Sequence, residues 1–81
     1  MVMFVTFGDR SESLRLFNDL KARGVVASVI TTPREAAVGC GLSVKFSAQD
    51  LGRVRSVISS RPRKSFIGVF KNVGGVISRM F

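Results

Sequence analysis

The first residues of the chain, MVMFVTFGDRSESLRLFNDLKARG (residues 1–24), contain a complete strand-and-helix unit. Residues 1–7 are mostly β-branched, aromatic or otherwise apolar and are followed by Gly8, which predicts a strand. Residues 12–23 place apolar side chains every three residues among charged ones, which predicts an amphipathic helix ended by Gly24. Ahead of this helix, the possible N-terminal caps are Asp9, with Glu12 completing a capping box, or Ser11.

The strand-and-helix unit is followed by a similar second one. We expect further strands at residues 25–31, 42–46 and 65–71, and a second helix from about residue 47 to 60. This β-α-β-β-α-β order is typical of an α+β, ferredoxin-like sandwich, a four-stranded antiparallel sheet with two helices on one face. The helix residues expected to cover that face are Leu14, Phe17, Leu20, Leu51, Val54 and Ile58.

Length and composition indicate one domain, residues 1–81, that folds without disulfides. No apolar run is long enough for a membrane span, and the N-terminus lacks the features of a signal peptide. The single cysteine fits a reducing cytoplasm, and we expect no metal site within one chain and no bound cofactor. Residues 72–81 read equally as a short helix or as a strand at an interface.

The net charge of +8 is concentrated in the second half of the chain, where no acid follows Asp50. Such a half attracts phosphates, nucleic acid or acidic proteins, although a solvated basic face is an equally simple interpretation. The expected topology brings three loops to one pole, and with them five cations and Cys40. The cations are Arg10, Arg34, Arg61, Arg63 and Lys64.

Cys40 lies between Gly39 and Gly41, which would leave its sulfur approachable, and nearby cations would favour its thiolate. The alternative is that Cys40 is a small buried apolar residue. The chain has no histidine, so a Cys-His pair cannot form, which argues against acyl-transfer or protease chemistry.

The run Thr-Pro-Arg-Glu at residues 32–35, followed by Cys-Gly-Leu at residues 40–42, resembles the signature of a selenium/sulfur carrier-like family of small bacterial and archaeal proteins. The resemblance implies that Cys40 carries sulfur or selenium. It also implies supporting loop positions at Pro33, Arg34 and Gly41. Members of the family tend to have small hydroxyl residues just before the cysteine, where this chain has Ala-Val-Gly at residues 37–39.

These observations predict a carrier or binding protein rather than a true enzyme. Cys40 would hold a persulfide or selenosulfide received from a donor protein and pass it to an acceptor protein by thiol exchange. An alternative is a non-catalytic module that binds nucleic acid or another anion, with strand phenylalanines stacking on bases. Those residues are Phe4, Phe46, Phe66 and Phe70. A third hypothesis is a homodimer formed through residues 76–81.

Overall fold

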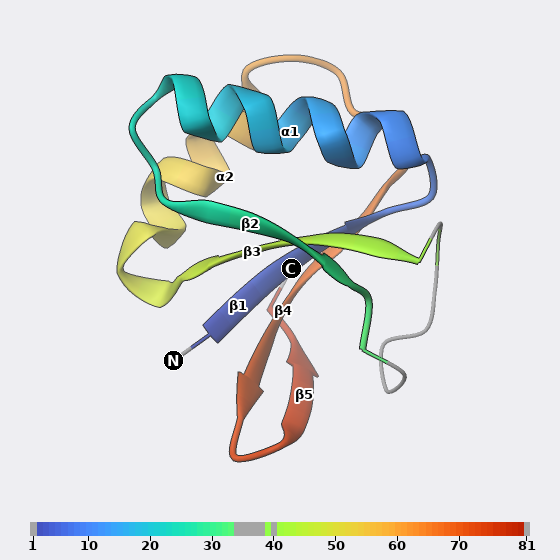
Figure 1. The fold of residues 1–81 in the computed structure, drawn as a ribbon, viewed down its shortest axis with the longest axis vertical. Helices are drawn as coiled ribbons and strands as arrows, with labels where there is room; N and C mark the ends of the chain where they lie inside the picture. The colour runs from blue at the N-terminus through green and yellow to red at the C-terminus, as the bar shows by residue number, and fades with distance from the viewer. Residues whose placement is uncertain (1, 34–38, 40, 81) are drawn as a thin grey trace.

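The structure is a computed structural model that describes residues 2–33, 39 and 41–80 (Figure 1). It has an α+β architecture with two α-helices and a five-stranded antiparallel sheet in the order β2-β3-β1-β4-β5. The elements are β1 (Val2–Phe7), α1 (Arg10–Ala22), β2 (Ala27–Thr31), β3 (Leu42–Ser47), the 3₁₀ turn η2 (Ala48–Asp50), α2 (Leu51–Ser59), β4 (Phe66–Val73) and β5 (Val76–Arg79).

The order of the first four strands follows the expected topology, since β1 pairs with β3 on one side and with β4 on the other. The prediction of four strands was wrong, because the chain adds β5 beside β4. Gly74 and Gly75 have φ of 57° and 86°, the left-handed values that a tight two-residue hairpin turn requires. Of the two interpretations of residues 72–81, the strand is therefore the correct one, and it pairs within its own chain.

Both helices cover the same face of the sheet, as predicted. Alternate residues of β1 enter one apolar cluster with residues of both helices. Its buried members from the helices are Leu16, Leu20, Val54 and Val57, and those from the strands are Met3, Val5, Phe7, Val44, Phe46 and Val69. Alternation along β1 assigns the intervening Phe4 to the opposite face.

The buried stripe of α1 differs from the predicted one. Leu14 is 40% exposed, whereas Leu16, which lies outside the predicted stripe, is fully buried. A spacing of three residues drifts around a helix of 3.6 residues per turn, and the buried face instead follows Ser13, Leu16 and Leu20, with Phe17 packed at its edge. The predictions for Leu20 and Val54 were correct, and Leu51 and Ile58 are partly buried against the same cluster.

The four strand phenylalanines do not form an exposed aromatic platform. Phe46 is 3% exposed within the apolar cluster, and Phe66 packs against that cluster from β4. Phe4 is 1% exposed and stacks on Phe70, with the ring centroids 5.4 Å apart. The phenylalanines therefore divide between the two faces of the sheet, and two of the four are buried.

Candidate functional site

The segment that contains the only cysteine connects β2 to β3. These two strands pair up to Thr31 and Leu42, and one residue further the backbone N–H of Thr32 donates to the carbonyl of Gly41 at 2.9 Å. The two ends of the connection are thereby held together. Pro33 follows directly and is half-buried, while Arg34 and Cys40 lie outside the described residues.

A chain of hydroxyl groups lies at the base of this connection. The Ser43 hydroxyl is 2.7 Å from that of Thr32 and 3.0 Å from that of Thr6, so the chain links β1, β3 and the end of β2. Ser43 and Thr6 are fully buried. Buried hydroxyls are costly unless they are paired, and these two contacts give both buried hydroxyls, those of Thr6 and Ser43, a partner.

These hydroxyl groups do not stand out in the sequence. The pattern LSVKF over residues 42–46 indicates a strand with one apolar and one polar face, and a serine on the polar face is ordinarily exposed. The facing register of Thr6 and Ser43 is the signal that would have found them, and it follows only once β1 is paired with β3.

Gly39 approaches the end of β1 more closely than any other residue type could. Its φ is +81°, and a Cβ at this position would lie 2.2 Å from the Phe7 carbonyl oxygen and 2.8 Å from Cδ1 of Ile67. Gly41 also has a positive φ, +85°, but a Cβ there would meet open space. The two glycines expected to leave the cysteine approachable thus differ, because Gly39 is required sterically and Gly41 only conformationally.

The beginning of α1 and the segment before β4 meet beside Gly39. The Gly8 N–H, directly after Phe7, donates to the Ser65 carbonyl at 2.7 Å. The Glu12 carboxylate accepts hydrogen bonds from the Ser65 N–H, at 2.8 Å, and from the Ser65 hydroxyl. These bonds from Ser65 lower the pKa of Glu12 below its ordinary value.

Only one of the two residues of the expected capping box, Asp9, caps α1. Asp9 is the N-cap residue, and it accepts from the Ser11 hydroxyl at 2.7 Å and from the Ser11 N–H at 2.9 Å. These bonds lower the pKa of Asp9 below its ordinary value. Glu12, which would complete the box, binds Ser65 instead. The helix therefore begins at Arg10, two residues earlier than predicted, and its first turn is tied to a segment more than 50 residues away in sequence.

Two of the predicted cations lie at this end of the molecule. Arg10 is the exposed first residue of α1, and Lys64 is exposed just before Ser65. Lys64 lines a surface hollow of about 430 Å³, together with Asp9, Ser11, Glu12, Arg15, Pro62 and Ser65. This end of the fold therefore combines cations with hydrogen-bonded carboxylates.

Arg61 and Arg63 point elsewhere. The Arg63 guanidinium donates to the Asp19 carboxylate at 3.0 Å and to the Val57 carbonyl at 3.1 Å, and its side chain is only 3% exposed. Arg61, with a half-exposed side chain, lies 3.4 Å from the same carboxylate. Both guanidinium groups thus share one acid on α1, and neither residue lines the hollow beside Lys64.

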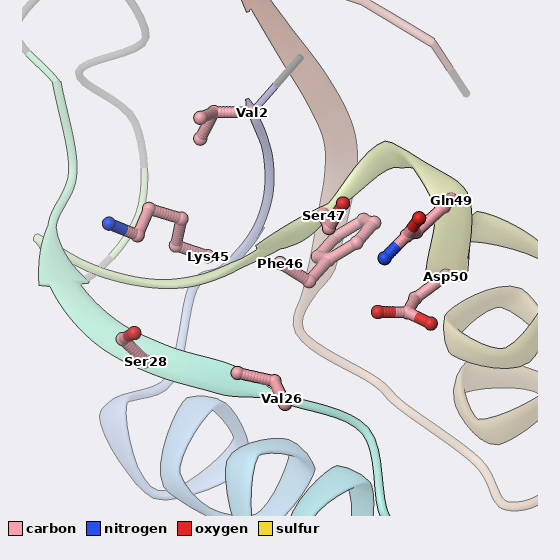
Figure 2. Close-up of a pocket in the computed structure, with 8 residues that line it drawn as sticks. All are labelled: Val2, Val26, Ser28, Lys45, Phe46, Ser47, Gln49 and Asp50. Carbon is pink, nitrogen blue, oxygen red and sulfur yellow. The ribbon is translucent and has the colours of Figure 1, made fainter.

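A hollow of about 460 Å³ lies at the opposite end of the sheet, where β1 begins and β3 ends (Figure 2). Figure 2 shows Lys45 on one side of it, with Gln49 and Asp50 on the other. Among the described residues, no three side chains that commonly bind metals gather in one place. Within the described residues, neither helix is long and apolar enough to cross a membrane.

Residues 3–63 match the family described as "Putative Se/S carrier protein-like". No curated protein and no solved structure matches the chain. The matched region covers β1 to the end of α2 and includes the whole connection between Thr32 and Gly41. The chain therefore belongs to the Se/S carrier protein-like family.

Proposed function

We propose that the protein carries sulfur or selenium as a persulfide or selenosulfide on Cys40. The observation that carries this proposal is the family match, which spans the only cysteine in the chain. The proposed supporting residues around this thiol are Pro33, Arg34, Gly39, Gly41, Arg10 and Lys64, with Arg61 and Arg63 contributing positive potential from a greater distance.

The proposed step needs only one cysteine. The Cys40 thiolate attacks the outer sulfur of a donor persulfide, a new S–S bond forms at Cys40, and the donor leaves as a thiolate. The thiolate of an acceptor then attacks the outer sulfur and releases the Cys40 thiolate. No external oxidant or reductant is consumed, since the sulfane sulfur is only exchanged between thiols, and a reducing compartment such as the cytoplasm keeps Cys40 available.

The described backbone on both sides of Cys40 supports this role. Gly39 is packed against the Phe7 carbonyl, and Gly41 is held by the Thr32 N–H. A thiol that exchanges with partner proteins needs a defined position, because its rate depends on access and on the neighbouring charges. We interpret the scaffold that supplies this position as a ferredoxin-like sandwich extended by β5.

Cyanolysis tests the proposal. Protein treated with a persulfide donor and desalted should release thiocyanate when cyanide is added, because cyanide removes sulfane sulfur. The Cys40→Ser variant should release none. Thiocyanate release that is equal in the two proteins would contradict the assignment of the carrier to Cys40.

A further inference from the structure

A second basic site lies between the end of α1 and the first turns of α2. A hollow of about 370 Å³ there is lined by Arg23, Gly52, Arg53, Ser56 and Val57. Only Val57 is buried, and it forms an apolar floor at 2% exposure. The two arginines, the serine and the glycine are exposed. The hollow therefore offers two guanidinium groups and one hydroxyl to a ligand.

The two arginines of this hollow lack acidic partners within the described part of the chain. Of the acids described there, Asp19 is bound to Arg61 and Arg63, Glu12 to Ser65, and Asp9 to Ser11. Asp50 precedes Arg53 by one turn but forms no ion pair with it. Arg63 forms an ion pair with Asp19 and is nearly buried, whereas Arg23 and Arg53 are exposed to solvent. The positive charge of Arg23 and Arg53 is therefore available to a ligand.

The hollow suits a phosphate group. A guanidinium fork can donate two parallel hydrogen bonds to phosphate oxygens, and two such forks with the Ser56 hydroxyl provide donors for three oxygens. Gly52 adds no side chain, and a Cβ there would meet open space, so the ligand can approach the backbone. The contribution of the helix terminus itself is small, because the Leu51 N–H is already bonded to the Ala48 carbonyl.

The surrounding charge favours a chain of phosphates over a single one. Lys21 and Arg55 are exposed on the same two helices and extend the positive charge beyond the hollow, each on a different side of its helix from the nearby arginine, and α2 contains no acid. We propose that this helical surface, centred on Arg23 and Arg53, binds the phosphate backbone of nucleic acid. This is independent of the carrier proposal and of Cys40, and it does not use the strand phenylalanines.

Fluorescence anisotropy with a labelled oligodeoxythymidine, measured across a range of salt concentrations, tests this site. For a single strand, log K falls with log salt by about 0.7 for each phosphate neutralised, so the Arg23→Gln/Arg53→Gln variant should bind more weakly and lose about 1.4 from the slope. The matched control is Lys45→Gln/Arg79→Gln, which removes the same charge from exposed positions on β3 and β5. It should keep the slope of the wild type.

Two competitors and one variant complete the test. Polyglutamate at equal charge should displace the oligonucleotide poorly, and inorganic phosphate should displace it only at far higher concentration. Cys40→Ser should bind like the wild type. Equal loss in both double variants would show attraction by net charge alone and would overturn the site. The site would also be overturned if the Arg23→Gln/Arg53→Gln variant, with a native circular dichroism spectrum, kept the affinity and salt slope of the wild type. Displacement of the labelled oligonucleotide by polyglutamate as effective as that by unlabelled oligonucleotide would overturn it too.

Discussion

The Ser43 hydroxyl lies 2.7 Å from the Thr32 hydroxyl, and this pair ties β3 to the residue that begins the cysteine-containing connection. Ser43 also binds Thr6 on β1, so the connection is anchored to the centre of the sheet. Sulfur transfer needs a thiol at a defined position, and these hydroxyls hold one end of the segment on which that thiol lies.

Replacing Ser43 should therefore destabilise the protein. Ser43→Ala leaves the buried Thr6 hydroxyl without its partner, which costs about 1–3 kcal/mol in the free energy of unfolding. The control is Ser28→Ala on β2, where the serine is exposed. Urea denaturation of both variants measures the difference, and equal stabilities would show that the hydroxyl chain contributes nothing.

The two glycines beside Cys40 should respond differently to alanine. Both substitutions place a Cβ at positive φ, which costs about 1–2 kcal/mol, but only Gly39→Ala also forces a Cβ against the Phe7 carbonyl. Gly39→Ala should be less stable than Gly41→Ala by a further 1–3 kcal/mol or so. Thermal unfolding followed by circular dichroism compares the two. A Gly41→Ala variant as unstable as Gly39→Ala would contradict the close packing against β1.

The Glu12–Ser65 contact should make stability depend on acid pH. Because hydrogen bonds from Ser65 lower the pKa of Glu12 in the folded protein, its contribution to stability is present above its ordinary pKa of 4.5 and is lost as the pH falls through the lowered value. Glu12→Gln should flatten the decline in unfolding free energy below that pH. Asp50→Asn, which removes an acid that has no described hydrogen bond or ion pair, serves as the control. The same steep decline in Glu12→Gln and the wild type would show that this contact is not responsible.

The two arginines that bind Asp19 should differ in importance. Arg63 is nearly buried and donates to Asp19 and to backbone carbonyls, so Arg63→Ala should cost about 2–3 kcal/mol. Arg61 is half-exposed, and Arg61→Ala should cost less than about 1 kcal/mol. Arg63→Lys should not restore stability, since an ammonium group cannot reproduce the several directed bonds of the guanidinium. Full rescue by lysine in denaturant unfolding would contradict this account.

The sequence predicted those features that depend on local pattern. The positions of the helices, the first four strands and their order follow from hydrophobic periodicity, caps and glycines. The fifth strand does not follow from local pattern, because Val76 and its neighbours suit a short helix as well as a strand. Pairing with the edge of β4 selects the strand.

The sequence predicts where in the fold the candidate site lies, but it does not predict which side chains contact one another there. Connectivity alone predicts that Gly8, Gly39 and the segment before β4 lie at one end, and the described contacts agree. The partners of individual charges depend on side-chain geometry that a pattern does not contain. Connectivity predicts Arg63 at the same end as Cys40, and its guanidinium donates to the Asp19 carboxylate and to the carbonyls of Ile58 and Val57. Thr6 and Ser43 can be identified as a pair only from the register of β1 and β3, and their burial depends on what covers that face of the sheet.

The central claim, that Cys40 carries the sulfur, is tested most directly by intact-mass spectrometry after incubation with a persulfide donor. The wild-type protein should gain the mass of one sulfur atom, since it has one cysteine, and a reducing thiol should remove that mass. The Cys40→Ser variant should keep its original mass under the same conditions. No added sulfur in the folded wild-type protein, or the same addition in Cys40→Ser, would contradict the claim.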